Sequence, residues 1–305
     1  DCVVWSGMSP LSASDLSALH QLLMICGDYA SQQSQQPFQV FEKGVDDYVT
    51  TVDRLLDQKL LLGIRELFPA DGIITEENRA TVEQFRQSSG QRESGGDRPL
   101  WFVDPIDGTD DFIQGRDHYA VMVGRVVKGE PQAGWIYAPV GRHLVWGGPG
   151  WGLFEQTGGG HTTPLIPKQP PFAPERGWAM VIGDKDERRF GSAIAQRCPK
   201  VEFLSLGSFG LKVLAVITGR AGIYIYLNGR VKLWDTTGPL ALAQAAGLMC
   251  CDLAGRPIRF TEPDVDPQTL IHQQPIVVGW PSYVEALLSP LREIAAAIGL
   301  PQEGL

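Results

Sequence analysis

The sequence predicts a layered fold of the α/β (α+β) class, in two tightly joined lobes. Three observations predict it: two helical patterns open the chain, a run of neighbouring strand patterns follows, and strand and helix patterns then alternate toward the C-terminus. The chain has 305 residues, which is enough to bury a large core. A stretch rich in glycine and proline separates the strand run from the alternating part, and we predict lobes at residues 1–165 and 166–305.

Two helices are expected in the N-terminal lobe. Leucines recur at helical spacing from Leu16 onward, and Ser14 is the expected N-cap of this helix. A second apolar stripe at helical spacing follows Asp53 and stops at Pro69, since proline cannot continue a helix. The polar stretch 86–99 is rich in glycine and serine, and we expect a mobile loop there.

The middle of the chain predicts a meander of antiparallel strands. Short β-prone runs, separated by turn residues, cover residues 119–127, 133–138, 143–146 and 152–155. After the boundary stretch 158–174, strand and helix patterns alternate, which predicts a smaller α/β lobe. Its expected strands are 178–182, 201–204 and 222–227, and its expected helices are 187–197 and 208–218.

Composition narrows the classes of function. The 26 basic residues are outnumbered by 35 acidic ones, and the formal net charge of −9 disfavours extended binding of nucleic acid, which requires a basic surface. No apolar run approaches the length of a membrane span and no signal peptide is evident, so we expect no membrane partner. The 5 cysteines lack zinc spacing, and their odd number indicates reduced thiols and a cytoplasmic protein.

The most informative segment is W-F-V-D-P-I-D-G-T at residues 101–109. It opens with β-prone residues that predict a short buried strand. Asp104 and Asp107 then stand around a turn, with the carbonyl of Ile106 between them, and Gly108-Thr109 leads into a helix start. Hard oxygen donors suit Mg²⁺, and the amides of a helix start suit phosphate. A simple turn built on Asp-Pro and Asp-Gly is the alternative.

Two further acidic sites lie far away in the sequence. The stretch 72–75 predicts a short strand that ends at Glu76 and Glu77, although a surface pair of glutamates is commonly just solvated. Asp235 follows Trp234 and is the expected N-cap of a helix. A capping aspartate can also bind a metal if its other oxygen faces a site, so both roles stay open for Asp235.

These three features, in this order, resemble the inositol monophosphatase superfamily of Mg²⁺-dependent, lithium-sensitive phosphatases. That family carries an acidic pair, then D-P-[IL]-D-G-T, then W-D-x-x-[AG], which match residues 76–77, 104–109 and 234–238 of this chain. The resemblance extends from about residue 43 to about residue 260. It implies stacked α, β, α, β and α layers, as in inositol monophosphatase and fructose-1,6-bisphosphatase, with the site in the cleft between the lobes.

The resemblance also implies ligands for two or three Mg²⁺ ions. The first ion would be held by Glu76, Asp104, the Ile106 carbonyl and Asp107. The second would be held by Asp104, Asp107 and Asp235. A third would lie near Asp53.

The same resemblance assigns the catalytic roles. Thr109 and Glu76 would orient the attacking water and help to deprotonate it, and Asp47 would lie on the leaving-group side. The phosphate would be held by the amides of Asp107, Gly108 and Thr109. No covalent phospho-enzyme is implied.

Substrate choice depends on two segments of the second lobe. Ser208 and Lys212 resemble the serine and lysine with which nucleotide-type members contact their substrate, at a spacing one residue longer; a solvated helix lysine is the alternative for Lys212. Asn228 stands about where inositol-type members carry a glutamate that grips ring hydroxyls. Arg230 and Lys232 would favour a second phosphate over a neutral polyol, unless they are only surface cations on a turn.

We therefore predict a Mg²⁺-dependent phosphomonoesterase whose preferred substrate is 3′-phosphoadenosine 5′-phosphate, hydrolysed to AMP and phosphate. Inositol monophosphate is the second candidate substrate, alone or as part of a dual activity, and a sugar bisphosphate is the third. A catalytically silent metal or nucleotide sensor is the alternative from a different class. The expected partner is a small phosphomonoester, and the sequence leaves open whether the chain forms a homodimer.

Overall fold

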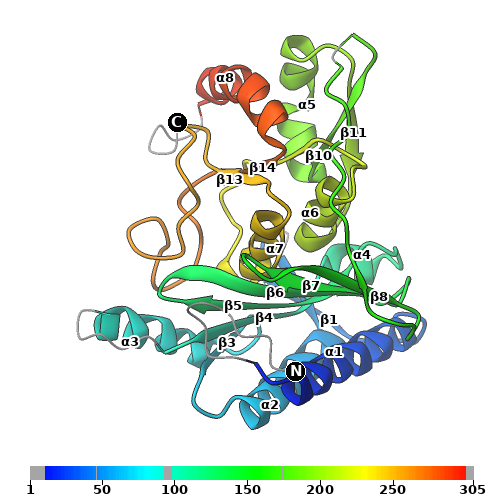
Figure 1. Cartoon of the computed structure of the whole chain (residues 1–305), viewed down its shortest axis with the longest axis vertical. Helices are drawn as coiled ribbons and strands as arrows, with labels where there is room; N and C mark the ends of the chain where they lie inside the picture. Colours follow the sequence, from blue (N-terminus) through cyan, green and yellow to red (C-terminus); the bar gives the residue numbers. More distant parts are fainter. Residues whose placement is uncertain (1–10, 46, 93–97, 174, 300–305) are drawn as a thin grey trace.

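Five layers of helices and sheets stack on one another in the computed structural model, which describes residues 11–45, 47–92, 98–173 and 175–299. Two helices cover the outer face of a seven-stranded sheet, two lie between this sheet and a five-stranded one, and two cover the far side (Figure 1). The pair on the outer face is α1 (Ala13–Gln33) and α2 (Thr51–Leu67). The pair between the sheets is α6 (Phe209–Ile217) and α7 (Leu233–Ala245), and the pair on the far side is α5 (Asp184–Arg197) and α8 (Pro281–Ala297). This order of layers confirms the predicted fold class.

The seven-stranded sheet contains the predicted meander. It runs in chain order through β3 (Gly72–Thr75), β4 (Leu100–Asp107), β5 (Ala120–Val127), β6 (Glu130–Ala138), β7 (His143–Gly148), β8 (Gly152–Thr157) and β9 (Thr163–Pro164). Strands β3 and β4 are parallel, and every later pair is antiparallel. Successive residues of β4 face opposite layers: Trp101 and Val103 join the core beneath α1 and α2, while Phe102 joins the core on the other side.

The five-stranded sheet is mixed. Its order is β11 (Val201–Ser205), β10 (Trp178–Ile182), β12 (Ile223–Tyr226), β14 (Ile276–Gly279) and β13 (Met249–Cys251). Strand β10 pairs in parallel with β11 and β12, and the other two pairs are antiparallel. The connection between the two sheets runs from Pro164 to Trp178, where the proposed lobe boundary falls.

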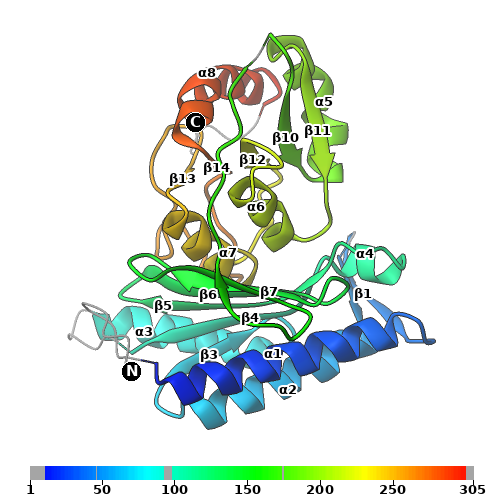
Figure 2. The same cartoon turned by 45° about the vertical axis from the view of Figure 1, so that its right-hand side comes forward.

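The remaining elements lie around the edges of the larger sheet (Figure 2). They are the hairpin of β1 (Val40–Gly44) and β2 (Asp47–Thr50), the 3₁₀ turn η1 (Arg79–Val82), α3 (Glu83–Arg92) and α4 (Thr109–Ile113). Within the described ranges, no helix is both long and apolar enough to cross a membrane.

Two local predictions are wrong. The first helix begins at Ala13, so its N-cap is Ser12 and not Ser14, because the Ser12 hydroxyl accepts the Asp15 N–H at 3.1 Å. The polar stretch 86–99 is helical at its start, since α3 continues to Arg92. Residues 93–97 of that stretch lie outside the described residues.

Helix α7 packs on the seven-stranded sheet by backbone contact. A Cβ atom at Gly134 of β6 would lie 2.1 Å from the carbonyl oxygen of Gly238 in α7, and one at Gly124 of β5 would lie 2.3 Å from the Gly238 nitrogen. Real Cβ atoms cannot come this close, so the approach requires glycine on the sheet side. The contact brings the first turn of α7, with Asp235, close to the end of β4.

We expect Gly134→Ala to destabilise the protein by about 1–3 kcal/mol, because the added methyl group forces two backbones apart. Thermal unfolding measures the effect. Gly141→Ala is the matched control, since the nearest atom that its Cβ would meet is 4.0 Å away. Equal unfolding temperatures for the two variants would show that the α7 contact tolerates a side chain.

Candidate active site

Three carboxylates meet between the two sheets. Asp104 and Asp107 come from the end of β4 and Asp235 from the start of α7, and one oxygen of each lies within 4.8 Å of the others. The first two side chains are buried, at 1% and 7% exposure. At such separations two unit charges repel by roughly 3–4 kcal/mol at an effective dielectric near 20. The set therefore fits a divalent cation, which carboxylate oxygens of this kind bind and which removes the repulsion.

An irregularity in β4 places both aspartates on one side of the strand. Residues three apart in a regular strand point to opposite faces. Here Asp104 pairs with Met122 and Asp107 with Ala120, so three steps along β4 match two along β5. This is a β-bulge, which inserts one extra residue and re-aims the side chains that follow. The Ile106 N–H, inside the bulge, donates to Asp104 Oδ1 at 3.0 Å.

The start of α6 fixes Asp107. The Ser208 hydroxyl and the Gly210 N–H, the latter at 2.8 Å, both donate to Asp107 Oδ2. Ser208 is also the N-cap of α6, and its oxygen accepts the Leu211 N–H at 3.0 Å. Burial raises the pKa of Asp107, and these donors act in the opposite direction because they favour the ionised form.

Asp235 is the third helical residue of α7, so the prediction that it caps the helix is wrong by three positions. Lys232 is the N-cap, and its N–H donates to Asp235 Oδ2 at 2.6 Å. Burial, followed by the charges of Glu76 and Asp107, raises the pKa of Asp235 to about 7. One oxygen of Asp235 thus accepts the N–H of the N-cap residue, and the side chain still lies close to the other two carboxylates.

Glu76 and Glu77 follow β3 as predicted, but a lysine lies between them. The Glu76 N–H donates to the Val103 carbonyl at 3.1 Å, which extends the pairing of β3 with β4. Lys43 Nζ of β1 lies 2.8 Å from Glu76 Oε1 and 2.7 Å from Glu77 Oε1. Burial alone would lower the pKa of Lys43, but the two glutamates outweigh it and raise the pKa.

The carboxyl group of Glu76 is also a neighbour of the aspartate cluster. Burial raises the pKa of Asp104 well above its ordinary value, and the largest charge that raises it further is that of Glu76. Sequence reasoning missed Lys43, because nothing in its local pattern distinguishes it from a solvated strand lysine.

Asp53 and Thr109 connect α2 with α4. The Thr50 N–H donates to Asp53 Oδ2 at 2.8 Å, which caps α2. Thr109 Oγ1 lies 3.3 Å from Asp53 Oδ1 and 3.0 Å from the Ile106 carbonyl oxygen. Burial raises the pKa of Asp53 to about 6. The hydroxyl of Thr109 is therefore placed between a carboxylate and the bulge of β4.

Gly108 makes this arrangement possible. It has a φ of +95°, and a Cβ there would lie 2.7 Å from the His118 carbonyl oxygen. Only glycine adopts this left-handed conformation in so little space.

The remaining predicted residues have contacts with other segments near the site. Lys212 is only 7% exposed and donates to the Gly207 carbonyl at 3.0 Å, so it is not a solvated helix lysine. Arg230 is exposed, and its Nη1 donates to the Val45 carbonyl of the β1–β2 hairpin at 3.2 Å. Asp47 lies in the same hairpin, with its carboxylate 3.7 Å from Lys43 Nζ and 46% of its side chain exposed.

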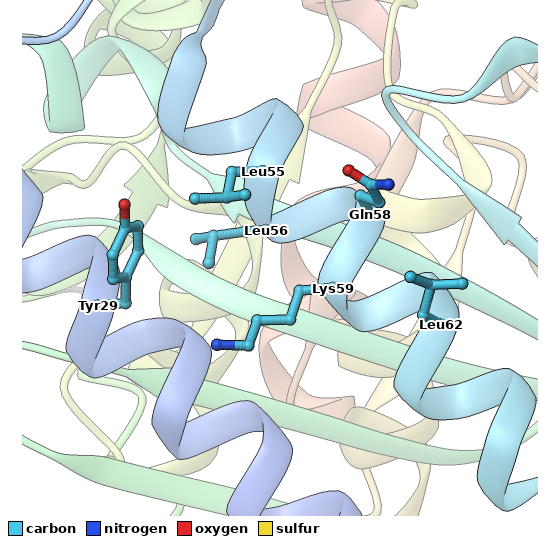
Figure 3. A pocket seen from close by; sticks show the side chains of 6 residues that line it. All are labelled: Tyr29, Leu55, Leu56, Gln58, Lys59 and Leu62. Carbon is cyan, nitrogen blue, oxygen red and sulfur yellow. The ribbon is translucent and has the colours of Figure 1, made fainter.

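A separate hollow of about 280 Å³ lies between α1 and α2. Figure 3 shows Tyr29 of α1 facing Leu55 and Leu56 of α2, with Lys59 below them. These two helices lie on the outer face of the seven-stranded sheet, whereas α7 lies on the inner face. The hollow therefore belongs to a different part of the molecule from the acidic cluster.

Comparison with known proteins identifies the family of this chain. The model of the inositol monophosphatase family matches residues 13–296. The chain belongs to the inositol monophosphatase family. Membership in this family supports a Mg²⁺-dependent phosphatase that acts on small phosphate esters, and the acidic cluster can bind the metal.

Individual relatives are more distant. The 3′(2′),5′-bisphosphate nucleotidase CysQ of Salmonella typhimurium is 28% identical over 248 residues, covering 81% of this chain and 94% of that protein. The Nus factor SuhB of Pasteurella multocida is 29% identical over 221 residues, covering 68% and 73%. The solved structure of a Thermotoga maritima IMPase superposes with a TM-score of 0.72 at 21% identity, covering 94% of this chain and all of that one, which shows the shared fold.

The raised carboxylate pKa values predict how stability depends on pH and Mg²⁺. The pKa is about 7 for Asp235 and Glu77 and about 6 for Asp53, against ordinary values near 4. Because the folded state holds these protons more tightly than the unfolded chain, they contribute stability that is lost as pH rises from about 4 to about 7. Mg²⁺ binds the deprotonated carboxylates, so we expect the increase in Tm on adding Mg²⁺ to grow between about pH 5 and pH 8.

Thermal unfolding in EDTA and in Mg²⁺ across this range measures the difference. The variant Asp235→Asn should show a smaller difference with a weaker dependence on pH. A Mg²⁺-induced shift of the same size at both ends of the range would contradict the assignment.

Proposed function

We propose that this protein is a Mg²⁺-dependent phosphomonoesterase that hydrolyses 3′-phosphoadenosine 5′-phosphate to AMP and phosphate. The observation that carries the reaction type is the meeting of Asp104, Asp107 and Asp235 beside the start of α4. Family membership supports the same reaction type. For the substrate, the support comes from the cations next to Asp235 and from the similarity to a bisphosphate nucleotidase.

The residues that would hold Mg²⁺ are the three aspartates together with Glu76 and the Ile106 carbonyl, and Asp53 would lie near a third ion. When bound, Mg²⁺ neutralises charge on the phosphoryl group and lowers the pKa of a bound water. Glu76 reaches this centre only if its carboxylate is shared with, or released from, Lys43. The β1 lysine would then keep Glu77, which it also contacts.

Thr109 and Glu76 would orient the attacking water and help to deprotonate it. The Thr109 hydroxyl donates to Asp53 Oδ1 at 3.3 Å, so its oxygen is free to accept a hydrogen bond from the water. The amides of residues 107–109 would hold the phosphate oxygens, and Asp47 would lie on the leaving-group side.

Arg230 and Lys232 would recognise the second phosphate. The charge of Lys232 acts against the overall rise in the pKa of Asp235, so Lys232 lies near the aspartate cluster. Arg230 contacts the β1–β2 hairpin through the Val45 carbonyl, so its guanidinium lies beside the segment that contains Asp47 and Lys43. A planar cation at this place suits the 5′-phosphate of the substrate better than the hydroxyls of inositol. Ser208 and Lys212 would then contribute to the nucleotide site from α6, where they donate hydrogen bonds to Asp107 and to the Gly207 carbonyl.

We propose the cytoplasm as the compartment. Among the described residues, Cys26, Cys198, Cys250 and Cys251 are free thiols, which is typical of a reducing environment.

We expect Asp104→Asn to abolish phosphate release while leaving a folded protein, because it removes ligand charge and almost no volume. Phosphate release from 3′-phosphoadenosine 5′-phosphate, with Mg²⁺ and with EDTA, measures this. Asp117→Asn, a change at an exposed aspartate, is the control and should retain activity. Tight binding of the nucleotide by the parent protein without any turnover would instead indicate a sensor.

The role of Arg230 predicts a difference between two substrates. Arg230→Ala should raise KM about tenfold for 3′-phosphoadenosine 5′-phosphate and leave it unchanged for adenosine 3′-phosphate, which lacks the second phosphate. Arg176→Ala, at an exposed arginine, should change neither value. A parent enzyme that prefers inositol monophosphate by a factor of about a hundred or more would overturn the proposed substrate, but not the reaction type.

A further inference from the structure

Asp57 of α2 is a buried carboxylate that neither the predicted ligand set nor the proposed mechanism uses. It is 4% exposed, and each of its oxygens accepts one hydrogen bond. Oδ2 accepts the Thr75 hydroxyl at 2.9 Å, and Oδ1 accepts the Glu77 N–H at 3.1 Å. The two donors are the residues immediately before and after Glu76.

These bonds, with two others, fix the backbone on both sides of Glu76. The Thr75 N–H donates to the Thr81 hydroxyl at 3.0 Å, and the Glu76 N–H donates to the Val103 carbonyl at 3.1 Å. Three consecutive residues at the end of β3 thus have directed bonds from three different elements. The bonds of the Glu76 and Glu77 N–H groups both lie beyond the last residue of β3. The first continues the pairing with β4, and the second, to Asp57, directs the chain as it leaves the strand.

The direction of this segment decides where the Glu76 carboxylate lies. Glu76 must serve two neighbours, Asp104 at the aspartate cluster and Lys43 at the β1 strand. A small rotation of the backbone at residues 76–77 would move the carboxylate away from the cluster. Partners that orient a metal ligand in this way typically affect metal affinity by about 10- to 100-fold.

We propose that Asp57 is a positioning residue for the metal centre, which holds Glu76 toward Asp104 by bonding both of its neighbours in the chain. This inference rests on the proposed function, because it takes Glu76 as a ligand of Mg²⁺. Its effect comes from the two hydrogen bonds and not from the charge of Asp57.

Replacement by alanine and by asparagine separates these two causes. Asp57→Ala removes the charge and both bonds, so the dissociation constant for Mg²⁺ should rise about tenfold or more. Asp57→Asn also removes the charge, but its oxygen can accept the Glu77 N–H while its amide donates to the Thr75 oxygen. This variant should bind Mg²⁺ within about threefold of the parent. Isothermal titration of the whole chain with MgCl₂ measures both.

Asp252→Ala is the matched control for loss of a buried carboxylate. Asp252 is fully buried, and its Oδ1 accepts the Ala254 and Arg256 N–H groups, both at 2.9 Å. It follows the last residue of β13, which is a strand of the five-stranded sheet. This variant should lose stability and keep the Mg²⁺ affinity of the parent. If Asp57→Ala does not fold, Thr75→Val replaces it, with an expected loss of about threefold or more in Mg²⁺ affinity.

The outcomes separate the inference from the proposed function. A parent protein that binds no Mg²⁺ and releases no phosphate overturns the proposed function, and the inference with it. A functional parent whose Asp57→Ala or Thr75→Val variant binds Mg²⁺ unchanged overturns the inference alone. Equal losses in Asp57→Ala and Asp57→Asn would show that the charge acts, which also overturns it.

Discussion

Repulsion among buried carboxylates is the constraint on which the rest of the site depends. The approach of Asp104, Asp107 and Asp235 is unfavourable by itself, since burial removes solvation from each carboxylate and their charges raise one another's pKa values. They stay together because each is held by an independent element. A bulge in β4 aims two of them, the start of α6 holds one oxygen of Asp107, and the capping bond of α7 holds one oxygen of Asp235.

The same constraint explains why the elements of this site come from both halves of the chain. Helix α7 lies between strands β12 and β13 of the smaller sheet in sequence, but its contact with Gly124 and Gly134 packs it against the larger sheet. Packing of this kind is stiff, because backbone touches backbone and no flexible side chain lies between. A rigid frame is what a cluster of like charges requires, since a soft frame would let the carboxylates move apart or take up protons.

Local sequence patterns predicted much of the fold and part of the site. The meander and the alternating segment were predictable because their hydrophobic periodicity is strong and their turns are marked by glycine and proline. The order of the acidic motifs predicts that Glu76, Asp104, Asp107 and Asp235 form one site, and the three aspartates do lie together in the structure. What could not be predicted depends on contacts between distant segments. Lys43 and Asp57 carry no local signal, and their partners near Glu76 lie far away in the chain. The exact start of α7 also depends on backbone angles that residue types alone do not determine, so the sequence pattern predicts Asp235 as the N-cap, whereas it is the third residue of the helix.

The bulge between Asp104 and Asp107 has a consequence for the length of this segment. In a regular strand, side chains point alternately to the two faces of the sheet, so residues three apart lie on opposite faces. The extra residue of the bulge returns Asp107 to the same face as Asp104. Removing one residue here, or adding one, would turn one aspartate to the far side of the sheet, into the aromatic core around Trp101 and Trp135. The identities of the residues between the two aspartates can therefore vary more freely than their number. Two intervening residues are needed for both carboxylates to reach the same metal site.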